Sequence, residues 1–345
     1  MEKYYSSVLT ASGLLCNCKV LCEKHPESKF YIITNGTDFE RSVFFDELIK
    51  HFKGYSIVEY SPFYDETPNG IYIKNLDTYV LADSHYNKVC PVSPGVCENE
   101  IDLSRKVIIT HKDKNQITEH FIAEKKQYKK AVSLLSLANV CKENRNSLLS
   151  DYLVDDRMIN ALKRILKKLP LNVRKGKPIV KFLSAVTPLG IHTVWNTVFE
   201  NYETVIELED EHAFTSAIIA GIVRDRLIAE NEEFILIPDL FLRTIPQMIL
   251  LPQSGFAFIR SDENHPLPFA PSYRINTEKF TLVPKDIKSK CRLLNEAENT
   301  YIENAVSCIY NGRDERRKMN RLLLPYSDVD NAKKTAEELF DKIMS

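Results

Sequence analysis

The chain has 345 residues, of which 44% are hydrophobic and 27% are charged, so we expect one or two globular domains and not a disordered chain. Its 46 basic residues nearly balance its 47 acidic residues, and the net charge of -1 gives no reason to expect nucleic acid or a membrane surface as a partner. No run approaches the roughly 18 apolar residues of a membrane span, and the first residues lack the layout of a signal peptide.

The eight cysteines form no C-x-x-C pair, and no histidine stands beside them at the spacing of zinc ligands. Cys18 and Cys22 could share one face of a helix, but cysteine is also a common small core residue. Unpatterned thiols without an export signal are typical of the reducing cytoplasm. We therefore expect a cytoplasmic protein without a cysteine-based metal centre.

The first half of the chain alternates short apolar runs with helical patterns. Its expected elements are a strand over 30–33, a helix with apolar residues across 43–52, strands over 56–60 and 79–83, and a helical arm over about 113–170 that contains helices over 115–149 and 155–169.

The second half repeats this order. Its expected elements are a strand over 204–208, a helix with apolar residues across 218–228, strands over 234–238 and 256–260, and a helical arm over about 285–345 that contains helices over 287–310 and 328–344. Ser42 and Ser216, which follow the first strand of each half, lie 174 positions apart (216 − 42). The apolar pattern of 161–169 recurs at 335–343 with the same offset.

This recurrence predicts an internal duplication of one α/β unit. Strands joined through helices favour mainly parallel sheets with crossover helices. We expect a first repeat over 1–172 and a second over 176–345. The boundary falls in 170–178, a basic stretch with two prolines and one glycine that ends the preceding helix.

The segment between the first strand and helix of each half is where a phosphate-binding P-loop, G-x-x-x-x-G-K-[ST], would lie. Its glycines let backbone N–H groups surround phosphate, its lysine neutralises the phosphates, and its hydroxyl binds Mg²⁺. In the first half this segment reads Asn35-Gly36-Thr37-Asp38-Phe39-Glu40-Arg41-Ser42, and in the second it reads Glu209-Asp210-Glu211-His212-Ala213-Phe214-Thr215-Ser216.

In the order and spacing of its elements, the chain resembles a group of uncharacterised bacterial ATPase-like proteins with two tandem P-loop NTPase domains. Each domain of that family opens with a strand and a G-x-P-G-T-G-K-S loop and carries a long helical arm. The resemblance covers nearly the whole chain and implies two P-loop NTPase-like domains, with ATP and Mg²⁺ as possible ligands. The defining loop residues are mostly replaced.

The first loop keeps part of this chemistry. Asn35 replaces the first glycine, Glu40 the second and Arg41 the lysine, whereas Gly36 and Ser42 remain. A carboxylate about 4 Å from a phosphate charge costs about 1 kcal/mol in water and about 4 kcal/mol at an effective dielectric constant of 20. The loop could still hold a diphosphate. Alternatively, Arg41 is a surface charge and Ser42 an ordinary first-turn residue, and the missing motif residues favour this second interpretation.

The second loop has no glycine, no lysine and three carboxylates, and it keeps only Ser216. We expect it not to bind phosphate. Its acidic residues are typical of helix capping.

Two residues after the third apolar strand of the first half are further candidates. Asp83 ends that strand and could bind Mg²⁺ directly or through water, together with Ser42. His85 could contact a base or phosphate, and the resembling family has a histidine near this position. Both are also ordinary turn or cap residues. The nucleotide-binding candidates are Asn35, Gly36, Arg41, Ser42 and His85.

The sequence thus favours a degenerate P-loop NTPase-like protein that acts as a binding or scaffold module and has lost ATPase chemistry. One alternative is a residual nucleotide-binding ATPase that uses the first loop. Another is a nucleic-acid or protein partner bound by the basic first arm and the linker after it, through Lys125-Lys126, Lys129-Lys130, Lys163-Arg164, Lys167-Lys168 and Arg174-Lys175. A protein partner is plausible, whereas the few aromatic residues among these lysines make nucleic acid a weaker expectation.

Overall fold

The computed structural model describes residues 2–17, 21, 27–87, 98–103, 109–171, 173–262 and 265–345. Cys18, Cys22, Cys90 and Cys97 lie outside these residues, whereas Cys141, Cys291 and Cys308 are free thiols and the Cys16 thiol donates to Asn87 Oδ1 at 3.0 Å. No described helix combines the length and the apolar composition that crossing a membrane requires.

The first half of the chain forms one mixed sheet, whose described strands lie in the order β2-β1-β4-β5-β6-β3-β7. Its elements are β1 (Glu2–Thr10), β2 (Gly13–Cys16), β3 (Lys29–Thr34), α2 (Asp38–His51), β4 (Ile57–Pro62), β5 (Gly70–Ile73), β6 (Thr78–Ala82) and β7 (Glu98–Asp102).

The second half forms a sheet in the order β15-β11-β14-β13-β12-β8, with a separate hairpin of β9 and β10. Its elements are β8 (Ile179–Val180), β9 (Ser184–Thr187), β10 (Gly190–Thr193), α5 (Trp195–Phe199), β11 (Thr204–Glu209), α6 (Thr215–Ala229), β12 (Ile235–Pro238), β13 (Pro246–Leu251), β14 (Phe256–Ser261) and β15 (Tyr273–Asn276). Read from β7 and from β15, the two sheets repeat one order of strands.

The α/β class expected from the sequence is confirmed, and both sheets are mixed, because each combines parallel pairs with antiparallel pairs. The β4–β5–β6 and β12–β13–β14 pairs are antiparallel, while β3 and β11 each have two parallel neighbours. The antiparallel pairs arise because short connections can join only antiparallel strands. One such connection turns at Asp77 (φ 45°), and its counterpart turns at Gly255 (φ 61°), both in the left-handed region.

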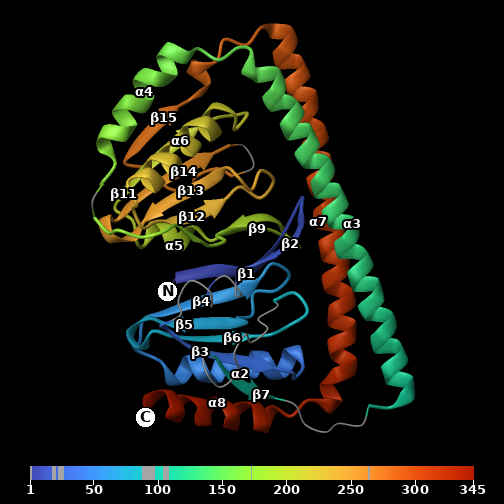
Figure 1. The fold of residues 1–345 in the computed structure, drawn as a ribbon. Coiled ribbons are helices and arrows are strands. Elements are labelled where there is room, and N and C mark those ends of the chain that lie inside the picture. The colour runs from blue at the N-terminus through green and yellow to red at the C-terminus, as the bar shows by residue number, and fades with distance from the viewer. Residues whose placement is uncertain are drawn as a thin grey trace.

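The two sheets pack face to face, and helices cover their outer faces (Figure 1). Alternation along β3 shows how the sequence builds these layers. Phe30 and Ile32 face the second sheet, whereas Tyr31 and Ile33 face α2. The result is a helix–sheet–sheet–helix stack with one shared core between the sheets.

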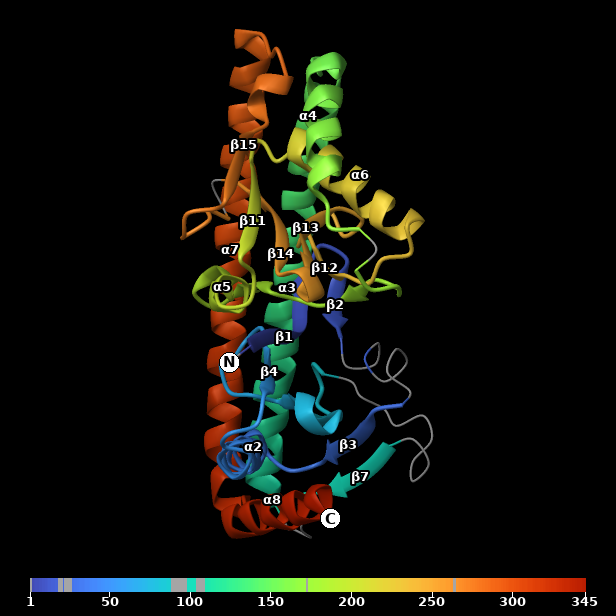
Figure 2. The same cartoon turned by 90° about the vertical axis from the view of Figure 1, so that its left-hand side faces the viewer.

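Two long helices, α3 (His111–Ser150) and α7 (Lys285–Leu323), run antiparallel along one side of this stack (Figures 1 and 2). We call this pair the arm. Small buried residues such as Ala131, Ala138 and Ala305 line its seam and allow close approach. At Gly312 an added Cβ would lie 2.4 Å from Cε1 of Tyr128, so glycine is needed there. The arm helices therefore pack with each other, and neither pairs with the helix that follows it.

The last helix of each half packs on the other half. Helix α4 (Asp155–Lys168) follows α3 but packs against the second sheet and α6 through Met158 and Ile165. Helix α8 (Val329–Met344) follows α7 but packs against α2 through Ala336 and Leu339. Each outer helical layer thus combines helices from both halves of the sequence.

Candidate functional site

The first loop leaves β3 through two residues in the left-handed conformation, Asn35 (φ 58°) and Gly36 (φ 70°). A Cβ at Gly36 would lie 3.0 Å from Cβ of Leu103, so the turn needs glycine both for its φ and for its space. Asparagine tolerates this conformation better than most residues. Its Nδ2 donates to Oδ1 of Asp102 at 2.9 Å, which fixes the turn to β7.

The start of α2 is closed by a capping box. Thr37 Oγ1 accepts from the backbone N–H of Glu40 at 3.2 Å, and Glu40 Oε2 accepts from the backbone N–H of Thr37 at 2.6 Å. The other Glu40 oxygen accepts from the backbone N–H of Asp328 at 2.6 Å. Glu40 is buried, and its carboxylate occupies the helix end where a P-loop would present N–H groups to phosphate.

Arg41 turns back onto its own loop. Its Nη1 donates to the carbonyl oxygens of Asn35 and Gly36 at 2.9 and 2.8 Å, and its Nη2 contacts Asp38 Oδ1 at 2.5 Å. In a working P-loop the amides point at the anion. Here two loop carbonyls and a carboxylate already take the donors of the guanidinium.

A buried cation from the arm reaches this loop. Arg316 of α7 donates to Asp38 Oδ1 at 2.8 Å and to Glu124 Oε1 at 3.1 Å, and it lies over the ring of Tyr64 at 4.6 Å. Burial alone would raise the pKa of Asp38, but the charges of Arg316 and Arg41 hold it well below its usual range. Burial raises the pKa of Glu124, with Arg316 opposing the rise.

In the second loop a carboxylate sits where phosphate would bind. Asp210 is buried, and its Oδ2 accepts from the backbone N–H of Ser216 at 2.8 Å. Its Oδ1 accepts from the backbone N–H of His212 at 3.2 Å. The side chain of Asp210 thus caps the start of α6 from within the protein.

The cation of this second loop comes from β14. Arg260 is 1% exposed and donates to Ser216 Oγ at 3.3 Å, to Ala213 O at 3.0 Å and to Asp239 Oδ2 at 3.2 Å. Asp239 also pairs with Lys142 of α3 at 3.1 Å. Burial would raise the pKa of Asp239, but Lys142 and Arg260 hold it well below its usual range. The guanidinium of Arg260 and the carboxylate of Asp239, which lie beside the second loop, are therefore both paired with protein groups.

The arm connects the loops reciprocally. Lys142 on α3 contacts the second half, whereas Arg316 on α7 contacts the first, and these residues lie 174 positions apart (316 − 142). The acids Glu124 and Glu298 show the same separation (298 − 124), and each pairs with an arginine of the opposite arm helix. Each half thus places a cation beside the loop of the other.

A cavity of about 470 Å³ lies beside the first loop, between α2, the segment after β4 and α7. Arg317 and Arg321, one helical turn apart on α7, line it, and neither has a carboxylate partner among the described residues. Buried Asn69 also lines the cavity. Its side-chain Oδ1 and Nδ2 have no hydrogen-bond partner among the described residues.

Two carboxylates also line this first-loop cavity: Asp38, which pairs with Arg41 and Arg316, and Asp65. The first-loop cavity thus has Arg317 and Arg321 on one side, and an anionic polar ligand would have to bind there, away from Asp65.

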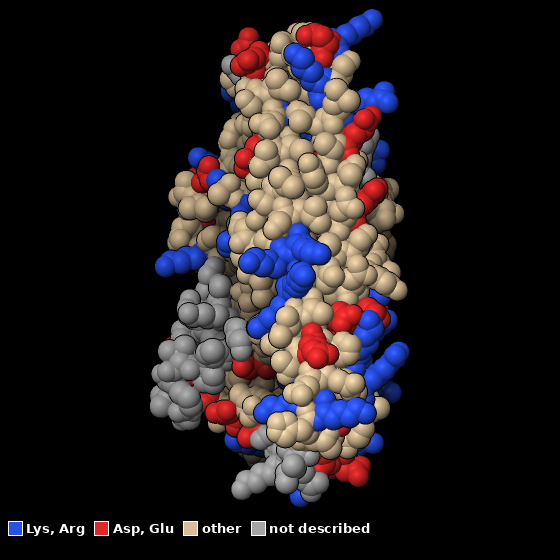
Figure 3. Space-filling view, turned by 90° about the vertical axis from the view of Figure 1, so that its right-hand side faces the viewer, with Lys and Arg blue, Asp and Glu red and all other residues tan. Residues whose placement is uncertain are grey.

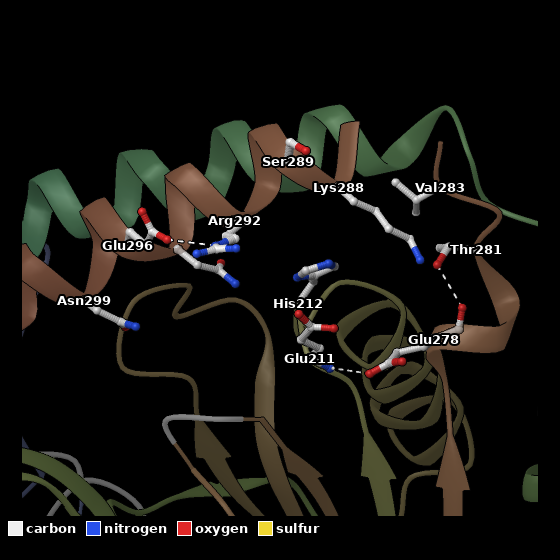
Figure 4. A pocket seen from close by; sticks show the side chains of 11 residues that line it. Glu211, His212, Glu278, Thr281, Val283, Lys288, Ser289, Arg292, Glu296 and Asn299 are labelled. Atoms are coloured by element: carbon white, nitrogen blue, oxygen red, sulfur yellow. Dashed lines mark hydrogen bonds and ion pairs between the residues drawn. The ribbon is translucent and has the colours of Figure 1, made fainter. Parts of the chain in front are cut away.

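The second loop faces a different cavity, of about 500 Å³, at the start of α7 (Figure 4). His212 rises from the loop toward Arg292, whose Nε donates to Glu296 at 2.9 Å. Glu278 lies at the other side and accepts from the backbone N–H of Glu211 at 3.3 Å. Acidic and basic groups are mixed here, and Arg292 forms an ion pair with Glu296.

The candidates named from the sequence divide into separate groups. Arg41 and Ser42 line the first-loop cavity. Asp83 follows β6, and its backbone N–H donates to Ile33 O at 2.8 Å. His85 is exposed and packs edge-on against Phe121 of α3 at 5.2 Å. Asn35 and Gly36 form the turn, and neither they nor Asp83 and His85 line this cavity.

Sequence reasoning missed the arm as a source of site residues. Arg316 and Arg317 belong to the run 313–318, whose interruption by acids makes it a weak sign of a binding surface, and Arg321 lies just beyond it. Lys142 and Arg316 occupy equivalent positions, 174 residues apart. The presence of a cation at both could have indicated a buried role for both.

The outer face of the arm does not present one basic surface. Figure 3 shows Lys and Arg gathered in separate groups over its lower half, with Asp and Glu beside them. Lys125 lies over the ring of Phe121 at 4.2 Å. On this face the described residues form no continuous basic track.

Among the described residues, one group of three side chains has the spacing of metal ligands: Glu47, His51 and Glu337. Glu47 and His51 belong to α2 and Glu337 belongs to α8, and neither Asp83 nor Ser42 is part of the group. Exposed groups of this kind are common without a metal, so the group carries no assignment.

No protein-family model, no curated protein and no solved structure matches the chain.

Proposed function

We propose that this chain is a degenerate P-loop NTPase-like binding module that takes an anionic ligand without hydrolysing nucleotide. The observation that carries the proposal is the same at both loops. A carboxylate of the protein, Glu40 or Asp210, caps the helix start where phosphate would bind. An arginine beside it, Arg41 or Arg260, is already bonded to loop carbonyls.

Nucleotide hydrolysis needs backbone N–H groups and a cation that point at the phosphates, together with bound Mg²⁺. In this protein a nucleotide would have to displace a buried carboxylate from a helix start and leave that charge without its partners. Breaking such a buried arrangement costs about 3–5 kcal/mol. This cost opposes triphosphate binding in either loop.

The first-loop cavity supports the binding role. Arg317 and Arg321 are exposed cations that the fold does not use, and phosphate or carboxylate groups are their natural partners. The corresponding positions, 174 residues earlier on α3, are Glu143 and Ser147, so these charges are particular to the first site.

Thermal unfolding with added ligand tests the proposal. The probes are inorganic phosphate, pyrophosphate, ADP and ATP, each at millimolar concentration with and without Mg²⁺. A ligand at a hundred times its dissociation constant stabilises the folded state by about 2.7 kcal/mol and raises Tm by a few degrees. We expect a rise with at least one phosphate compound and no requirement for Mg²⁺.

The double substitution Arg317→Ala with Arg321→Ala should abolish this rise. Lys333→Ala with Lys334→Ala, on the exposed surface of α8, removes the same charge and should leave it intact. Absence of any rise with wild-type protein, or equal loss in both double variants, would contradict ligand binding in this cavity.

The alternative, a residual nucleotide-binding ATPase, is favoured by one observation: Arg41 and Ser42 line the cavity. It requires Arg41 to leave its loop carbonyls and contact phosphate. A Mg²⁺-dependent rise with ATP that Arg41→Ala removes would favour this alternative.

A further inference from the structure

A groove of about 690 Å³ lies on the second half, between α4, β15 and the short turn Glu278–Phe280 (Figures 1 and 2). We call it the α4 groove. Its lining contains no Asp or Glu, and it contains the five cations Arg157, Arg164, Lys168, Arg274 and Lys279.

Apolar groups form the floor of the α4 groove. Ile165, Ile206 and Phe280 line it and are almost fully buried. The ring of Tyr273 is 48% exposed, and the ammonium of Lys168 lies 3.3 Å from its centre. An apolar floor with an exposed aromatic ring and a cationic rim suits a ligand that has both an apolar body and an acidic group.

Some of these cations already serve the fold. Arg274 pairs with Glu207 at 2.6 Å, and Arg157 donates to the backbone oxygen of Lys279 at 3.5 Å. Arg164 and Lys168 are exposed, stand one helical turn apart on α4, and have no carboxylate partner among the described residues. They are the groups available to a ligand.

The first half provides an internal comparison, because it builds the same layer from α8 and β7. With the 174-residue offset, Glu338 corresponds to Arg164 and Glu100 to Arg274. Asn99 corresponds to Tyr273. Lys168 corresponds to Lys342 and so keeps its charge. The same helix and strand therefore pack without Arg164, Arg274 and the ring, so the fold itself does not require these three groups.

We propose that the α4 groove binds a small amphipathic anion, with an apolar or aromatic body against Phe280 and Tyr273 and an acidic group at Arg164 and Lys168. Its volume lies in the range of small-molecule pockets, about 300–1,000 Å³. The cations surround one hollow with an apolar floor, which favours a small molecule over a polyanion. This inference is independent of the function proposed for the first-loop cavity.

Titration of the whole protein with 1-anilinonaphthalene-8-sulfonate tests the inference, because this probe is an aromatic anion whose fluorescence rises on apolar contact. We expect saturable binding of one probe per chain, weakened by salt and displaced by dodecanoate. The double substitution Arg164→Glu with Lys168→Glu should weaken binding about tenfold or more, because two attractive charges become repulsive.

The matched control is Lys163→Glu with Lys167→Glu. These residues have the same spacing and exposure on α4 but do not line the groove, so binding should stay within about twofold of wild type. Circular dichroism identifies any variant that has unfolded, and Tyr273→Ala then serves as a second groove variant with the same expected loss. No saturable binding, equal weakening in both double variants, or displacement by an oligonucleotide but not by dodecanoate would overturn the inference.

Discussion

At the scale of single residues, buried charge pairs join the two halves of the chain. Arg316 reaches from α7 to Asp38 and Glu124, and Lys142 reaches from α3 to Asp239. Removing one member of a buried pair leaves an uncompensated charge in a poorly solvated place, which costs more than the pair itself contributes.

Arg316→Met should therefore lower the free energy of unfolding by about 3–5 kcal/mol, because Asp38 and Glu124 lose their shared partner. Urea unfolding followed by circular dichroism measures this change. Arg317→Met removes the neighbouring exposed arginine and should change stability by less than about 0.5 kcal/mol. Similar losses in the two variants would contradict the buried role of Arg316.

The pH dependence of stability follows from the lowered pKa values of Asp38 and Asp239. A carboxyl whose folded pKa lies below its unfolded value, about 3.9, binds more protons when unfolded. Its contribution is present above that value and is lost as pH falls toward the folded pKa. Urea unfolding should show stability declining below about pH 4.

Asp239→Asn should remove one of these contributions. It lowers stability near pH 7, because Lys142 and Arg260 remain charged, and it makes the decline below pH 4 shallower. Unfolding curves for both proteins between pH 3 and 7 provide the comparison. A decline as steep as that of wild type would show that Asp239 does not titrate as described.

At the scale of elements, the arm depends on close contact between α3 and α7. Gly312 faces Tyr128, and the residues 174 positions earlier and later are Ala138 and Ile302. All four lie in the buried seam. The ring of Tyr128 thus leaves room only for glycine at position 312. At the equivalent positions the chain has Ile302 in place of the ring and Ala138 in place of the glycine.

Gly312→Ala should destabilise the protein by about 1–3 kcal/mol, because the added methyl overlaps the Tyr128 ring. Adding Tyr128→Ile copies the other half and should recover part of this loss. A double-mutant cycle by urea unfolding measures the coupling. Strictly additive effects would mean that the methyl and the ring do not meet.

Helical periodicity in the sequence located several elements closely. It predicted helices over 155–169 and 328–344, and the structure has Asp155–Lys168 and Val329–Met344. Period and capping depend on neighbouring residues, so the sequence carries them. It did not reveal β5, whose four residues are too few to set a pattern, or β13, whose apolar run over 248–251 shows no alternation.

The partners of α4 and α8 were also beyond prediction, since an apolar stripe shows which face is buried but not what buries it. The candidate site was predictable to the same degree. The residues of the two loops show that both P-loop lysines are absent. The charged side chains of Lys142 and Arg316, in contrast, come close to the loops only when the chain folds.

At the scale of the whole molecule, the exchange of α4 and α8 makes the halves interdependent. Without α8, the outer face of α2, including Phe44 and Phe52, would lose part of its cover. Without the second sheet, Tyr60 and Leu81 would lose the shared core. The repeated topology is what duplication of a unit with exchanged helices would produce.

Chains 1–172 and 173–345, produced separately, should therefore be unfolded or aggregated, because each exposes the sheet face that the other covers. Produced together, they should form a soluble one-to-one complex. Gel filtration with light scattering distinguishes these outcomes. Two stable monomers with cooperative thermal transitions would contradict the interdependence of the halves.

The central claim is that both loops are closed by the protein's own carboxylates and arginines, and its most direct test is phosphate release from Mg-ATP. Wild-type protein and Arg41→Ala should release phosphate at the same background rate, since neither loop presents a cation to the nucleotide. Turnover by wild-type protein that disappears in Arg41→Ala would show that the first loop opens and catalyses hydrolysis.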